Sequence, residues 1–327
     1  MNLSVLIPTI NRVNFILDKI KFYDELKFNG QIIIIDSSDD KSFQLIKKII
    51  SSFKNLNISH IRYFGNIFQA IQEGSTYIKK DFAVISGDDD YLIPKNMQKC
   101  IDKINDKGND IIGCHGQALV CPINQSHEKN FKVDYYFDPV INKNNSFDRL
   151  KQLLTQYGVL NFSVFKKKEF VNSFKNYQKL DKKVIEYHEI LNQSLLAIFG
   201  KISTINEITC IRGSHNQRIK VEVNNLAKFK AENYLRLYDI LENEIIKNIN
   251  IIDNLPRAKT QEKVKKILKL FFKKRFGLIK FNTFFIISYL KKINLSIKHI
   301  LLKRFKKIKK NKDFLLVYNF LRKNEKI

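Results

Sequence analysis

The sequence has no tryptophan, and only 11 of its 327 residues are glycine and five are proline. This scarcity excludes collagen-like and linker-rich designs. Long apolar runs are also missing, because the nearest approach to one, residues 281–290, is too short to cross a bilayer. Apolar residues make up 44% and charged residues 28% of the chain. That composition folds, so we expect one large domain with an appendage.

Cysteine is scarce as well. The four cysteines form no Cys-x-x-Cys pair, and no paired histidines follow at ligand spacing, which argues against a structural zinc site. The chain opens on an apolar strand pattern at residues 3–7 instead of a basic leader with a long apolar core. We therefore expect reduced thiols and a cytoplasmic protein.

Positive charge gathers near the C-terminus. The net charge is +26, and residues 257–312 hold 20 Lys and Arg residues against one acid, Glu262. Apolar residues recur there at helical spacing, which predicts a basic amphipathic tail over 257–327. Such a tail suits an anionic membrane surface, here the inner face of the cytoplasmic membrane. The alternatives are a generic basic face inflated by lysine-rich codon usage, or nucleic-acid binding, which is disfavoured because no nucleic-acid module is recognisable.

Short apolar runs alternate with amphipathic helical patterns in the first part of the chain. We predict strands at 3–7, 31–35, 58–63 and 82–85, with helices at 13–28, 43–53 and 68–78. This order is typical of an α/β fold with a mostly parallel sheet flanked by helices. Ligands of such sheets bind beyond the carboxyl ends of the strands.

The pattern changes after residue 110. We predict strands at 111–120, 131–137, 159–165 and 202–211, and helices at 147–157, 189–199 and 227–248. These elements predict a domain over 1–220 with two halves, 1–110 and 111–220. A connecting helix over 221–256 would join this domain to the basic tail.

Three adjacent carboxylates, Asp88, Asp89 and Asp90, follow the fourth predicted strand. They repel one another unless a cation compensates. Mg²⁺ or Mn²⁺ suits this pattern, because these ions use one or two protein carboxylates and complete their shells with phosphate oxygens and water. The alternative is a solvated acidic turn.

Polar residues also follow the other strands. Asp36 closes the second strand, where it either accepts hydrogen bonds from a nucleobase or ribose or serves as a helix N-cap or turn residue. Arg12, after the first strand, either pairs with phosphate or is solvated. The Gly-x-Gly-x-x-Gly fingerprint and the P-loop motif are both absent, which disfavours a dinucleotide site and an NTPase.

Taken in order, these motifs resemble the family 2 glycosyltransferases and their Rossmann-related GT-A fold. The resemblance covers residues 3–95: Ser4 to Arg12, the strand ending at Asp36, the helix start at Asn66, and the acidic triplet with Pro94. Relatives attached to surface-polysaccharide loci are the nearest comparison. The resemblance implies that a nucleotide sugar is bound by Pro8, Thr9, Asn11, Arg12, Asp36, Asn66, Asp88 and Arg212.

The family also places an acidic pair at a helix start, about twelve residues before a glycine. Counted back from Gly200, His188-Glu189 falls on that pair, although the first acid is replaced by histidine. The resemblance therefore implies that Glu189 is the general base, with Glu186 in reserve. A zinc-protease motif is excluded, because the fifth position of His-Glu-x-x-His is Asn192.

A later family element falls on residues 211–215. It implies that Arg212 contacts phosphate and that His215 joins Asp88, Asp89 and Asp90 at the diphosphate or metal. For His188 and His215, ordinary surface or helix-capping roles remain open.

The resemblance implies an inverting enzyme that uses Mn²⁺ or Mg²⁺. It would transfer a sugar from a nucleoside-diphosphate sugar, held by residues 1–110, to a glycan or lipid-linked acceptor at 111–220. Aromatic residues over 131–137 either stack on that acceptor or pack within a strand. One rival is a non-catalytic GT-A-like scaffold or binding protein working through its basic tail. Another is a nucleotidyltransferase, which is disfavoured because residues 8–11 lack a glycine-rich basic loop.

Overall fold

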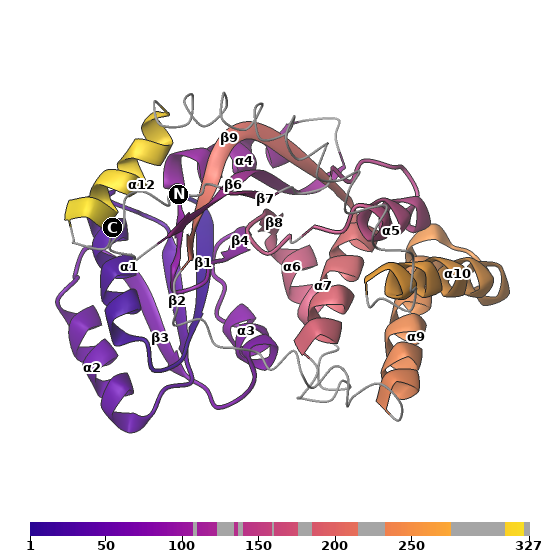
Figure 1. Ribbon diagram of the computed structural model, residues 1–327, viewed down its shortest axis with the longest axis horizontal. Helices are drawn as coiled ribbons and strands as arrows, with labels where there is room; N and C mark the ends of the chain where they lie inside the picture. Colours follow the sequence, from indigo (N-terminus) through magenta and orange to yellow (C-terminus); the bar gives the residue numbers. More distant parts are fainter. Residues whose placement is uncertain are drawn as a thin grey trace, which may run out of the picture.

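The structure is a computed structural model that describes residues 1–106, 110–122, 134–136, 140–158, 160–175, 185–214, 233–275 and 311–323. These residues form one mixed sheet of nine strands with helices on both faces (Figure 1). The strand order is β3-β2-β1-β4-β8-β6-β9-β5, and β7 pairs with β6.

The first part of the chain gives the parallel half of the sheet. Its elements are β1 (Leu3–Thr9), α1 (Val13–Glu25), β2 (Gln31–Asp36), α2 (Asp40–Ser51), β3 (Asn57–Arg62), α3 (Ile67–Ser75) and β4 (Phe82–Ile85). Strands β3, β2, β1 and β4 are parallel neighbours, as predicted. The isoleucine run of β2 is buried on both faces, which is the pattern of a central parallel strand.

Two elements follow that the sequence patterns did not predict. The acidic run leads directly into β5 (Asp90–Leu92), and α4 (Pro94–Asn105) begins with Pro94 at its first position. Proline favours that position because its missing N–H has no partner within the helix anyway. The third aspartate therefore belongs to a strand instead of a free turn.

The second part completes the sheet and adds helices. Its elements are β6 (Ile111–Pro122), β7 (Asp134–Tyr136), α5 (Ser146–Thr155), β8 (Val164–Lys166), α6 (Lys167–Phe174), α7 (Ile185–Phe199), β9 (Lys201–Ser214), α9 (Asn233–Asp253), α10 (Arg257–Arg275) and α12 (Lys312–Lys323). The strand predicted at 159–165 is shorter than expected, because residues 161–163 form a turn closed by the Ser163 N–H to Leu160 C=O bond of 3.0 Å. Helix α6 was not predicted.

Two helices of the predicted tail pack against the rest of the chain. The apolar face of α10 is buried with α7 and α9, through Val264, Leu268, Phe271 and Phe272. Helix α12 lies beside α1 (Figure 1), and the ring centroid of its Phe320 is 5.2 Å from that of Phe22. The basic cluster at 303–310 lies outside the described residues. Among the described helices, none combines the length and the apolar character that crossing a membrane requires.

Candidate active site

The acidic triplet lies at the carboxyl end of β4, in a tight turn between β4 and β5. The turn is closed by the Asp90 N–H, which donates to Gly87 C=O at 3.2 Å. Glycine at position 87 leaves room for the carboxylates, because a Cβ atom there would lie 2.5 Å from Asp90 Oδ2 and 2.8 Å from Asp89 Oδ1 and would displace them. The carboxylates therefore fold back over the turn backbone.

The loop after β1 binds the first of these carboxylates. Thr9 Oγ1 donates to Asp88 Oδ2 at 2.9 Å, and the Arg12 guanidinium donates to Asp88 Oδ1 at 2.7 Å. The same guanidinium lies 3.6 Å from Asp89 Oδ2. Burial and the neighbouring Asp89 charge raise the pKa of Asp88, against the opposing effect of Arg12 and Thr9.

A second arginine arrives from β9. Antiparallel pairing of β5 with β9 sets Arg212 opposite Asp90, with Arg212 Nε 3.7 Å from Asp90 Oδ1. Burial and the Asp89 charge raise the pKa of Asp90 to about 6, although Arg212 and Lys19 act in the opposite direction. The turn therefore lies between two guanidinium groups, each able to pair with phosphate.

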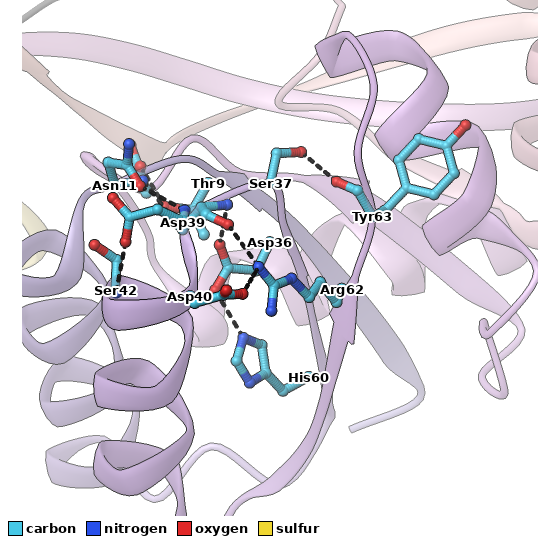
Figure 2. Close-up of polar contacts among 12 residues, drawn as sticks. Thr9, Asn11, Asp36, Ser37, Asp39, Asp40, Ser42, His60, Arg62 and Tyr63 are labelled. Carbon is cyan, nitrogen blue, oxygen red and sulfur yellow. Dashed lines mark hydrogen bonds and ion pairs between the residues drawn. The ribbon is translucent and has the colours of Figure 1, made fainter.

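The end of β2 forms a second part of this edge (Figure 2). Asp36 is fully buried, and its carboxylate accepts from Ser38 N–H at 2.8 Å and contacts His60 Nε2 at 2.9 Å. Burial by itself would raise the pKa of Asp36, but the bonds from His60 and Ser38 outweigh it and hold that pKa below its usual value. Asp36 is therefore a carboxylate that can only accept hydrogen bonds.

Neighbouring side chains fix this second part. Asn11, at a positive φ of 53°, accepts from the Asp39 N–H at 2.9 Å, and Asp39 itself caps α2 by accepting from Ser42. Arg62 pairs with Asp40 at 2.5 Å (Figure 2). Since Asp39 is the helix cap, Asp36 is not, although its bond to Ser38 stabilises the turn after β2.

The two parts meet through β1. Thr9 is the register partner of Asp36 in the parallel pair β1–β2, and its hydroxyl reaches Asp88. Asp36 and the acidic turn thus lie at one sheet edge, on neighbouring strands, as the strand-end rule predicts.

The predicted base lies on the first turns of α7, next to α3 (Figure 1). His188 is buried, and its ring stacks on Phe68 of α3 with centroids 5.5 Å apart. Glu189 is half-buried and accepts from the Tyr157 hydroxyl at 3.0 Å. Asn66 caps α3 by accepting from the N–H groups of Phe68 and Gln69. The start of α3 thus contacts His188, the neighbour of the predicted base, whereas Glu189 itself contacts Tyr157.

Comparison with known proteins identifies the group. The sequence profile of glycosyl transferase family 2 matches residues 4–167. The chain belongs to that family. It is a glycosyltransferase. The comparison with curated proteins found no match.

Solved structures share the fold. The crystal structure of S. aureus TarS superposes with a TM-score of 0.53 at 14% identity, covering 86% of this chain and 45% of TarS. TarS 1–349 in complex with UDP-GlcNAc superposes with a TM-score of 0.52 at 13% identity, covering 84% of this chain and 73% of that one. TarS 1–349 in complex with UDP superposes with a TM-score of 0.51 at 12% identity, covering 84% of this chain and 72% of that one. This chain therefore spans less than half of the first of these TarS chains. At sequence identities this low, the structural similarity shows a GT-A fold only.

The carboxylates of the acidic turn fit a divalent ion that is also bound by the substrate. Within the described ranges, no three His, Cys, Asp or Glu side chains form a cluster that could hold a metal alone. Asp88 is occupied by Thr9 and Arg12, and Asp90 is 4% exposed. Asp89, with 16% of its side chain exposed, is the most open of the three. One open carboxylate plus phosphate oxygens matches how Mg²⁺ and Mn²⁺ bind.

The predicted site residues fall into three groups. The structure brings together Thr9, Arg12, Asp88, Asp89, Asp90 and Arg212, with Asp36, Asn11 and Pro8 on the adjoining strand ends. Asn66 lies at the start of α3, and Glu189 lies on α7, where its carboxylate accepts from the Tyr157 hydroxyl. Glu186 is within α7 but its side chain lies outside the described residues, as does His215.

The sequence patterns did not predict four polar residues of this candidate active site. They are His60 on Asp36, Tyr157 on Glu189, and Lys19 with Ser86 beneath the acidic turn. A signal existed only for His60, because aligning β2 with β3 as parallel neighbours sets it opposite Ile34, close to Asp36.

Proposed function

We propose that this chain is an inverting, metal-dependent glycosyltransferase that moves a sugar from a nucleoside-diphosphate sugar to a glycan or lipid-linked acceptor in surface polysaccharide synthesis. The supporting observation is the convergence of Arg12, Arg212 and the Asp88–Asp90 turn at the sheet edge that also holds Asp36. Guanidinium groups suit a diphosphate, and a buried acceptor suits a nucleoside. Family membership favours this function over a non-catalytic scaffold.

In this proposal the groups that enclose Asp36 move aside so that its carboxylate accepts a hydrogen bond from the nucleobase, and Arg12 and Arg212 hold the diphosphate. Asp89 supplies the protein ligand of Mn²⁺ or Mg²⁺. The bound ion supplies positive charge that offsets charge developing on the leaving diphosphate.

Glu189 is the proposed general base, which removes the proton of the acceptor hydroxyl as that oxygen attacks the anomeric carbon. The Tyr157 hydroxyl, 3.0 Å from Glu189 Oε1, orients the carboxylate. Attack from the face opposite the leaving diphosphate inverts the anomeric centre.

The first donor to test is UDP-GlcNAc, because TarS, which shares the fold, was solved with it. A uracil ring N–H can donate to an ionised Asp36, and a guanine ring N–H can do so equally well. GDP sugars are therefore the second group of donors to test.

The test combines donor turnover with product stereochemistry. The wild-type protein with MnCl₂ should release UDP, and NMR of the product should show an anomeric configuration opposite to that of the donor. EDTA, Asp89→Asn and Glu189→Gln should each abolish turnover, while Asp102→Asn, an exposed carboxylate on α4, should not. Retention of configuration, or full turnover by Asp89→Asn in EDTA, would contradict the proposal.

We further propose that the enzyme works in the cytoplasm as a peripheral protein on the inner membrane face. Because its apolar face is buried, α10 would bind through charge. Its exposed face carries Lys259, Lys263, Lys265, Lys266 and Lys269 against Glu262. Each such lysine near an anionic surface contributes about 1 kcal/mol.

Charge reversal tests this better than truncation, which would uncover the core under α10 and α12. Lys259→Glu/Lys263→Glu/Lys266→Glu should weaken co-sedimentation with phosphatidylserine-containing vesicles. A matched triple reversal on α2, at Lys41, Lys47 and Lys48, should retain it. Equal losses in both variants would indicate a diffuse charge effect and contradict a role of α10.

A further inference from the structure

Helix α1 carries a lysine that no solvent reaches. Lys19 is 0% exposed and lies beneath the Asp88–Asp90 turn. An isolated buried ammonium is unfavourable, so its presence calls for compensating groups nearby.

The contacts of Lys19 lead to the turn. Its Nζ donates to Ser86 Oγ at 2.7 Å and lies 5.3 Å from the ring centroid of Tyr91. Ser86 Oγ in turn lies 3.2 Å from Gly87 C=O and 3.3 Å from Asp90 C=O. One hydroxyl thus links the buried ammonium to both ends of the turn.

The position of Lys19 differs from that of the two arginines. Arg12 and Arg212 lie at the rim, with 14% and 21% of their side chains exposed, where a diphosphate can reach them. Lys19 is enclosed, so it can act on a ligand only through the turn. Burial lowers the pKa of Lys19, and the charges of the three carboxylates act in the opposite direction, with Asp90 the strongest of them.

We propose that Lys19 is a positioning residue that fixes the Asp88–Asp90 turn so that Asp89 faces the donor diphosphate and its metal. This inference rests on the proposed function, because it presupposes that the turn binds a nucleoside diphosphate with a divalent ion. Lys19 itself touches neither ligand.

The test is calorimetric binding of UDP in the presence of MnCl₂. Lys19→Met keeps the length of the side chain but removes the charge, and a lost charge-assisted bond should weaken the Kd about tenfold. Lys19→Arg keeps the charge and should recover part of the affinity. In turnover, Lys19→Met should raise the donor KM more than it lowers kcat. A purely structural role would lower the folded fraction, and so kcat, without moving the Kd or KM.

Ser86→Ala provides a second variant if Lys19→Met does not fold. It removes the link and should also weaken UDP binding. Ser4→Ala is the matched control, because Ser4 is an equally buried serine on β1 whose hydroxyl donates to Gln31 Oε1 at 2.7 Å, at the other end of the strand. Its Kd should equal that of the wild type.

Two negative results differ in meaning. If the wild type binds UDP with Mn²⁺ and both Lys19→Met and Ser86→Ala bind within about twofold of it, the positioning role is wrong. If the wild type binds neither UDP nor GDP with Mn²⁺, the proposed function itself fails, and this inference falls with it.

Discussion

The bond between His60 and Asp36 gives a prediction with a calculable size. Asp36 is 0% exposed and the His60 side chain is 8% exposed, so water cannot replace a lost donor readily. Replacing His60 by alanine leaves a buried carboxylate with one bond fewer. A bond to a charged acceptor contributes about 1.5–3 kcal/mol, so we expect a loss of about 2 kcal/mol in the free energy of unfolding.

His60→Gln is the matched variant, because a glutamine amide can donate to Asp36 while carrying no titrating ring. The quantity to measure is the difference between His60→Gln and His60→Ala in urea unfolding at pH 7. The Gln variant should be the more stable by about 2 kcal/mol. A difference below about 0.5 kcal/mol would refute the view that the bond stabilises ionised Asp36.

The pH dependence follows from the direction of the Asp36 pKa, which its partners hold below 3.8. A lowered carboxylate pKa stabilises the fold above the unfolded pKa, and that stability is lost as pH falls through the folded pKa. Without His60 only the bonds from Ser38 oppose burial, so the pKa of Asp36 rises and its protonation costs the folded state less. The difference between the two variants should therefore shrink as pH falls towards 4, and a growing difference would contradict the assignment.

Three further predictions concern other parts of the molecule. Tyr157→Phe should lower kcat about fivefold at unchanged donor KM, because one bond to Glu189 is lost; an unchanged kcat would show that the bond plays no part in turnover. Gly87→Ala should weaken UDP binding in MnCl₂ on the order of tenfold, since the new Cβ displaces the carboxylates, and an unaltered Kd would contradict that geometry. Phe320→Ala should reduce the free energy of unfolding by about 3 kcal/mol in urea, whereas a loss under about 1 kcal/mol would mean that α12 is not part of the core.

The parallel half of the sheet could be predicted because its signals are local. The isoleucine run of β2 requires burial on both faces, and Gly65-Asn66 precedes a helix that Asn66 does cap. The strand-end rule then sets Asp36 and the acidic triplet at one edge without knowledge of any side-chain contact.

The remaining site depends on contacts between distant segments. Arg212 reaches Asp90 only because β5 pairs with β9, and β5 is a three-residue strand that begins at the last residue of the acidic run. Lys19 looks like an ordinary solvent-facing lysine in a helical pattern, and nothing local shows that it is buried. Periodicity likewise predicted the apolar face of α10 but not its packing against α7 and α9, since a pattern defines a face and leaves its partner open.

The most direct test is an experimental structure of the protein crystallised with UDP and MnCl₂. The account predicts uracil beside Asp36, the diphosphate between Arg12 and Arg212, and Mn²⁺ bound by Asp89 and phosphate oxygens. UDP bound away from the carboxyl ends of β1, β2 and β4, or Mn²⁺ bound without any residue of the Asp88–Asp90 turn, would contradict it.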